Sequence, residues 1–186
     1  MRNLVSILFL YFSIFCCKAA FSQQTLSTPQ FRNDFLTYIN KVRKKGCTCG
    51  VNYMPPAPPL TWNYQLESAA IGHAADMATQ HYFNHTSLDG RTMKDRINAT
   101  GYTLNGFRGI KIGENIAFGQ QSIAEVMQGW LNSEGHCKNL MGQGFKEIGI
   151  ARANDYWVQD FGGREPFTAE EQRLIKSGRY KIVYSH

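Results

Sequence analysis

The sequence lacks a hydrophobic run long enough to cross a membrane comfortably. Its most apolar stretch, LVSILFLYFSIFCC, occupies residues 4–17 and falls short of the roughly 20 apolar residues that a spanning helix needs. Arg2 precedes this run, and the small residues Ala20 and Ser22 follow it, which is typical of a secretory signal peptide. We therefore expect residues 1–22 to be a leader, and the protein to be secreted to the periplasm or the cell exterior. A lipoprotein processed at Cys16 or Cys17 is disfavoured because bulky Phe15 precedes them.

The sequence also lacks a strong excess of charge. It contains 20 Lys and Arg against 14 Asp and Glu, a net charge of +6, and removing the two leader cations Arg2 and Lys18 leaves +4. No dense basic patch accompanies this mild excess, so nucleic acid is a poor partner. Internal repeats and low-complexity segments are absent too.

Cysteine is scarce. Of the five cysteines, Cys16 and Cys17 lie in the predicted leader, which leaves Cys47, Cys49 and Cys137. An exported protein meets an oxidising compartment in which cysteines tend to pair. Cys47 and Cys49 are too close in sequence for an easy bridge to each other, so we expect one of them to pair with Cys137. The sequence leaves open which one.

The remaining chain predicts one mixed domain at residues 23–163, followed by a C-terminal extension at 164–186. With 186 residues, 43% of them hydrophobic, the chain can bury one core and hardly a second. Apolar spacing and capping residues predict helices at 29–45, 63–81, 92–99 and 122–132. IGENIAFG (112–119) reads as extended, and EIGIARA and YWVQDFG as a hairpin turning at Asn154-Asp155. In the extension, Thr168 and Glu171 form a capping box for a further helix, and residues 180–184 alternate as an edge strand.

Glu114 is the first candidate for chemistry. It shares a predicted strand face with Ile112, Ile116 and Phe118, and an unpaired carboxylate there costs several kcal/mol. It is either an acceptor for backbone amides or a ligand or base held in a pocket. Spacing alone does not separate these two roles.

Histidines supply further candidates. His81 and His85 are four residues apart, but Tyr82 occupies the place where a zinc protease has its glutamate, so that motif is absent. His73 lies on the apolar stripe of its helix and is expected to be a hydrogen-bonded packing residue. Asn84 and Asn98 begin glycosylation sequons, which matter only in a host that glycosylates exported chains.

The stretch NSEGHCKNLM (132–141) crowds three functional residue types into one turn. We expect Gly135 to make the turn and HCKNLM to begin a short helix, with His136 in its first turn. A helix N-terminus disfavours the imidazolium form, so a neutral His136 is able to bind a cation or act as a base.

Five motifs in order resemble those of the CAP superfamily, which comprises cysteine-rich secretory proteins, antigen 5 and pathogenesis-related 1. They are HAADMA, FNHTSLDG, GENIAFG, GWLNSEGHCKNLM and GIARANDYWVQDFG, and they are most similar to the bacterial secreted SCP-like branch. The resemblance covers about residues 30–162. It implies an α+β fold, a three-layer α-β-α sandwich with a central antiparallel sheet and a surface cleft.

In that family two histidines and two acidic residues line the cleft and can hold a divalent cation such as zinc. Carried over by motif, the ligands are His85, Glu114 and His136. Family members with the full set place a glutamate three residues after the tryptophan, whereas Glu134 lies four after Trp130. Glu134 is therefore only a candidate for the fourth position.

The resemblance implies a non-enzymatic module whose cleft binds a small hydrophobic ligand, such as a lipid or sterol, or a protein partner. The alternative is a metal-assisted hydrolase, a protease or esterase, in which Glu114 and His136 polarise a water molecule. Two histidines and one carboxylate do match an open catalytic zinc site. Against it, the chain has no nucleophile elbow, and Ser87 and Ser133 are candidates only by proximity, so we favour binding.

Overall fold

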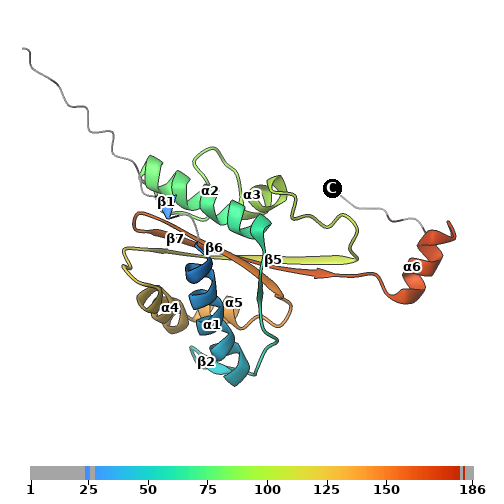
Figure 1. Ribbon diagram of the computed structural model, residues 1–186, viewed down its shortest axis with the longest axis horizontal. Helices are drawn as coiled ribbons and strands as arrows, with labels where there is room; N and C mark the ends of the chain where they lie inside the picture. The colour runs from blue at the N-terminus through green and yellow to red at the C-terminus, as the bar shows by residue number, and fades with distance from the viewer. Residues whose placement is uncertain (1–23, 26–27, 181, 183–186) are drawn as a thin grey trace, which may run out of the picture.

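The computed structural model describes residues 24–25, 28–180 and 182 (Figure 1). The predicted leader and most of the predicted edge strand at 180–184 lie outside these residues. Along the chain the elements are β1 (Gln24–Thr25), α1 (Pro29–Lys45), β2 (Cys47–Cys49), β3 (Asn52–Met54), β4 (Thr61–Trp62), α2 (Tyr64–Gln80), α3 (Met93–Ala99), β5 (Gly109–Phe118), α4 (Ile123–Asn132), α5 (Glu134–Leu140), β6 (Glu147–Ala153), β7 (Tyr156–Glu165) and α6 (Ala169–Lys176).

A five-stranded sheet forms the middle layer. Its strands run in the order β1-β6-β7-β5, with β4 also paired to β6. Helices α2 and α3 cover one face, and α1, α4 and α5 cover the other (Figure 1). This is the α+β, three-layer α-β-α sandwich that the motif resemblance implies.

The sheet differs from the prediction at one strand. The β1–β6, β6–β7 and β5–β7 pairs are antiparallel, but β4 pairs with β6 in parallel, Thr61 opposite Glu147 and Trp62 opposite Ile148. The segment before β4 cannot be helical because residues 55–59 contain four prolines. The proline segment follows the β2–β3 hairpin and leads directly into β4 beside β6.

Apolar side chains fill both gaps between sheet and helices. The larger cluster joins α1 and α4 to the sheet, with Phe35, Trp130 and Trp157 at its centre. The smaller cluster packs Ala70, Ala74 and Met77 of α2 against the opposite face. Here α2 lies very close to β6, because a Cβ atom placed on Gly149 would be 1.9 Å from the backbone nitrogen of Glu67.

The buried Arg43 joins α1 to the chain around α5. Its guanidinium donates hydrogen bonds to the backbone oxygens of Pro58, Leu140, Gly142 and Phe145 at 2.7–3.2 Å. Burial lowers the pKa of Arg43 to about 10. The buried charge of Arg43 is thus compensated by hydrogen bonds to backbone carbonyl oxygens instead of by an acidic side chain.

The helices begin and end close to their predicted boundaries, with one correction. Ser133 has extended backbone dihedrals (φ −97°, ψ 120°) and precedes α5, which begins at Glu134. The prediction that Gly135 makes the turn is therefore wrong, since Gly135 lies inside α5. His136 still occupies the first turn of this helix.

Helix α6 stands apart from the sandwich (Figure 1) and buries none of its residues. Its capping box is present, with the Thr168 hydroxyl accepting from the Glu171 amide. Among the described helices, none is both long and apolar enough to cross a membrane.

Candidate cation site and apolar groove

Glu114 lies in the middle of β5, which pairs with β7 alone among the described strands. The carboxylate is on the sheet face covered by α2 and α3, the same face as Ile116, and is 6% exposed. Its Oε1 accepts a hydrogen bond from His85 Nδ1 at 2.7 Å, and its Oε2 accepts from Arg96 Nη2, also at 2.7 Å. The partners expected for this buried carboxylate are therefore His85 and Arg96, and each carboxylate oxygen accepts a hydrogen bond from one of them.

These contacts keep Glu114 ionised. Burial by itself would raise the pKa of the carboxyl, but the His85 hydrogen bond and the Arg96 charge outweigh it and hold the pKa below its usual value. The buried Glu114 carboxylate is thus stabilised by the guanidinium of Arg96 and by the imidazole N–H of His85.

Arg96 also fixes the loop that carries His85. From α3, its guanidinium donates to the His85 backbone oxygen at 2.9 Å, to the Arg91 oxygen at 3.0 Å and to the Ser87 hydroxyl at 3.3 Å. Sequence reasoning missed this residue. The available signal was weak, an arginine beside Ile97 on a short helix.

His85 therefore has a fixed orientation with an exposed outer edge. Its Nδ1 is bound to Glu114, and its side chain is 55% exposed, which leaves Nε2 as the nitrogen available to a ligand. A carboxylate that receives the inner N–H of a histidine is the arrangement that orients metal-binding imidazoles.

His136 approaches from α5 on the other side of β5. Burial, and to a smaller extent the electrostatic influence of His85, lowers the pKa of His136. Its backbone oxygen accepts a hydrogen bond from Asn115 at 3.2 Å, while Asn139 donates to the Glu114 backbone oxygen at 3.2 Å. Hydrogen bonds from asparagines of β5 and α5 thus attach the start of α5, which carries His136, to the edge strand.

Asp160 lies beside Glu114 on the same face of the sheet. It is directly opposite Glu114 on β7, is 1% exposed, and has no hydrogen-bond partner for either carboxyl oxygen among the described residues. Burial and the charge of Glu114 raise the pKa of Asp160 well above its usual range. Sequence reasoning missed this residue too, because strand register alone brings it to Glu114.

His73 completes the buried cluster. Its Nε2 is 2.9 Å from the Asn84 backbone oxygen, and burial lowers its pKa. This is the packing role that the sequence predicts. Asn84 and Asn98, the sequon residues, are both exposed.

The other candidates lie apart from Glu114. Among the described residues, the hydrogen-bond partners of the Glu134 carboxylate are Lys138 and Asn52, which places it against the β2–β3 hairpin. His81 ends α2 in a left-handed conformation, so it shares no helix face with His85. Ser87 is buried and bound by Arg96.

His85, Glu114 and His136 do not close into a three-ligand cage. Within the described part of the chain, only Cys47, Cys49 and Cys137 bring three metal-ligating atoms within 4.8 Å of one another. Cys49 and Cys137 form the disulfide, which decides between the two pairings left open, and Cys47 is a free thiol.

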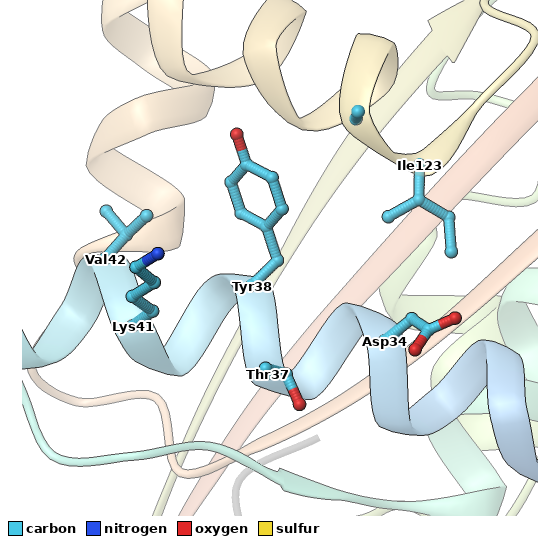
Figure 2. Close-up of a pocket in the computed structure, with 7 residues that line it drawn as sticks. Asp34, Thr37, Tyr38, Lys41, Val42 and Ile123 are labelled. Carbon is cyan, nitrogen blue, oxygen red and sulfur yellow. The ribbon is translucent and has the colours of Figure 1, made fainter.

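A separate apolar groove lies between α1 and α4. It has a volume of about 560 Å³, and Figure 2 shows Tyr38 extending from α1 toward α4, with Ile123 nearby. Neither His85 nor Glu114 lines it, so this groove is distinct from the histidine cluster. It is lined by Asp34, Thr37, Tyr38, Lys41, Val42, Ile123 and Ala124.

Comparisons with known proteins agree on the family. Residues 36–161 match the cysteine-rich secretory protein family, CAP. The chain is 33% identical over 108 residues to the uncharacterized protein YkwD of Bacillus subtilis and 32% identical over 102 residues to the membrane protein YlbC of that species. These matches cover 57% and 55% of this chain but only 40% and 28% of the relatives.

Two solved structures are similar over 72% of the chain. An extracellular protein containing an SCP domain from Bacillus anthracis shares 33% identity at a TM-score of 0.55, with 43% of its length covered. An outer surface protein of Borrelia burgdorferi shares 25% identity at a TM-score of 0.56, with 92% covered.

Proposed function

Because the chain belongs to the cysteine-rich secretory protein family, we propose that it is an exported module that binds a small apolar ligand. The observation that carries this proposal is the groove between α1 and α4. Its volume of about 560 Å³ falls in the range of small-molecule sites, about 300–1,000 Å³. Of the two structural relatives, one is an extracellular protein and the other an outer surface protein, which supports export.

The lining of the groove favours a molecule with an apolar body and one polar end. Tyr38, Val42 and Ile123 offer apolar surface, while Lys41 and Asp34 belong to the same lining. A few polar groups in a mostly apolar cleft orient a ligand. A lipid or sterol-like molecule has this chemistry, and Lys41 suits a carboxylate or another anionic headgroup.

Binding of cis-parinaric acid, a fluorescent fatty acid, tests this proposal. We expect saturable binding by the protein and a loss of affinity of at least about tenfold in Ala124→Trp, since an indole placed there fills the groove, and tenfold corresponds to about 1.4 kcal/mol. Thr79→Trp on α2 adds the same side chain at an exposed position on the other side of the sheet and should leave binding unchanged. Equal affinity in all three proteins, or no binding by the parent, would refute the groove as the site.

We further propose that His85 and His136 hold a divalent cation such as zinc. The His85 Nε2 edge and the neutral His136 ring are suitable nitrogen ligands, and Glu114 would act mainly by orienting His85. A bound zinc ion would supply a Lewis acid and a point of attachment for an anionic group. Glu134, held by Lys138 and Asn52, is the weakest candidate in the set.

Zinc titration calorimetry separates these roles. His85→Ala and His136→Ala should each weaken binding, because each removes one ligand of two. Glu134→Gln should not, because its carboxylate faces the hairpin. Binding that survives both histidine substitutions would rule out this cation site.

The engagement of Glu114 favours binding over hydrolysis. Each of its oxygens already accepts a hydrogen bond from His85 or Arg96, and the side chain is only 2% exposed, so water has little access to it as a base. Cleavage of an ester or peptide probe that Glu114→Ala abolishes would favour the hydrolase instead. If the protein instead acts by binding a protein partner at another surface, Ala124→Trp should lose binding of the fatty acid but keep binding of that partner.

A further inference from the structure

The three cysteines of the described chain form a compact triangle. Cys47 Sγ lies 3.7 Å from Cys137 Sγ and 3.9 Å from Cys49 Sγ, and the other two sulfurs are joined in the disulfide. Cys47 and Cys49 come from β2, and Cys137 comes from the first turns of α5. The triangle therefore sits where the β2–β3 hairpin meets α5.

The position of Cys47 does not suit exchange with the disulfide. A thiolate attacks a disulfide sulfur along the extension of the S–S bond, whereas Cys47 Sγ is almost equidistant from both sulfurs and therefore lies beside the bond. Burial also raises the pKa of the Cys47 thiol, which lowers the fraction of the reactive thiolate. The free cysteine calls for another role.

The two distances from Cys47 to the disulfide sulfurs are those found between neighbouring sulfurs in a metal-thiolate site, and reduction would free the third pair to separate. Zinc–sulfur bonds of about 2.3 Å in a tetrahedral site place neighbouring sulfurs about 3.8 Å apart, which is close to both distances from Cys47. Thiolate ligands select Cu⁺ and Zn²⁺. The surroundings are apolar, since Ala57 and Met141 are buried against the cysteines and Val42 and Met54 pack around them.

We infer that the reduced form of the protein binds one thiophilic cation, Zn²⁺ or Cu⁺, through Cys47, Cys49 and Cys137. A dithiol reductant converts the Cys49–Cys137 disulfide to two thiols and is itself oxidised to a disulfide. The three thiols then release three protons to solvent as their sulfurs bind the cation. The same sulfurs cannot form the disulfide and bind the metal, so the metal site exists only when Cys49 and Cys137 are reduced.

Both states connect the same elements. The disulfide links residues 88 positions apart, and closing a loop of that length stabilises a fold by restricting the unfolded chain. A metal bound to all three sulfurs would restore a link between β2 and α5 after reduction. The helix that carries His136 would thus stay attached to the hairpin in either state.

Absorption of bound Co²⁺, which replaces Zn²⁺ and gives a thiolate-to-metal charge-transfer band, tests the inference. The protein purified after export is compared oxidised and after reduction with a phosphine, which unlike a dithiol offers the metal no thiolate. We expect the band only in the reduced protein, and a more than about tenfold weaker affinity in reduced Cys47→Ser, since even outer-shell changes cost 10–100-fold. Cys47→Ser keeps the disulfide and therefore provides a folded oxidised control.

His136→Ala distinguishes this site from the histidine pair, because it should retain the charge-transfer band. Circular dichroism of the same samples monitors folding, and Zn²⁺ should restore native ellipticity to any reduced protein that has unfolded. Three outcomes would each overturn the inference. These are no band in reduced protein, an equal band in Cys47→Ser, and a reduced chain that stays unfolded with Zn²⁺ present.

Discussion

At the scale of single residues, two carboxyl groups with different charge states lie side by side on adjacent strands. Glu114 is ionised between Arg96 and His85, while Asp160 beside it has a raised pKa and no hydrogen-bond partner among the described residues. Like charges so close in a buried place cannot both form. Because Asp160 is neutral, His85 experiences the negative charge of one carboxylate, that of Glu114, and not of two.

Asp160→Asn should stabilise the protein near neutral pH. Because the folded-state pKa of Asp160 is raised, the folded chain binds a proton that the unfolded chain releases above about pH 3.9. Asp160 therefore lowers the stability as the pH rises, and asparagine removes that dependence. Urea denaturation should give a higher midpoint for the variant at about pH 7, with the difference shrinking toward pH 4.

Asp155→Asn at the β6–β7 turn serves as the control, because Asp155 is far less buried and should show no such trend. A gain for Asp160→Asn that is the same at both pH values would contradict the assignment of a neutral Asp160.

The residues that carry chemistry were predictable only where a local motif contains them. His85, Glu114 and His136 each stand in a recognisable stretch, and so does Cys137. Arg96 and Asp160 act through contacts that depend on the return of a loop and on strand register. No spacing within the chain encodes those two contacts, so single-sequence reasoning could not find them.

At the scale of elements, the distance between α2 and β6 is set by one missing side chain. Gly149 faces the backbone of Leu66 and Glu67, with which a Cβ would collide at 2.3 Å and 1.9 Å. Main-chain atoms cannot step aside as a side-chain tip can. The whole of α2 would have to move, and with it His73 and the start of the His85 loop.

Gly149→Ala should therefore destabilise the protein by about 1–3 kcal/mol or more, as overpacking does. Gly129→Ala in α4 is the matched control, because the nearest atom to its added Cβ is Gln120 Nε2 at 3.9 Å. Removing a glycine from a helix should stabilise by about 0.5–1 kcal/mol. Equal urea midpoints for the two variants would show that α2 adjusts freely.

The elements themselves were largely predictable from local signals. Helices begin at capping residues, since the hydroxyls of Thr28, Ser122 and Thr168 accept hydrogen bonds from the backbone amides of Phe31, Glu125 and Glu171. The turn before α5 was misplaced because a glycine was taken as its cause, whereas Ser133 breaks the helix with an ordinary extended conformation. A helix that ends at a residue other than glycine or proline is difficult to recognise from the sequence.

At the scale of the whole molecule, the layered architecture followed from the order of five motifs rather than from periodicity. The apolar groove did not, since its width depends on how far apart α1 and α4 pack. The sequence assigned ligand binding to the histidine cleft, while the structure offers a large apolar groove beside Tyr38. The two sites are separate in space, so they can be tested separately.

The strand order has a consequence for the time at which the protein can fold. The two central strands, β6 and β7, are the last of the sheet in the chain, and β1, β4 and β5 pair only with them. Until residues 147–165 have been synthesised, the earlier strands have no partner, and native pairing must close long loops. A nascent chain with this topology therefore cannot complete its sheet before β7 has been synthesised.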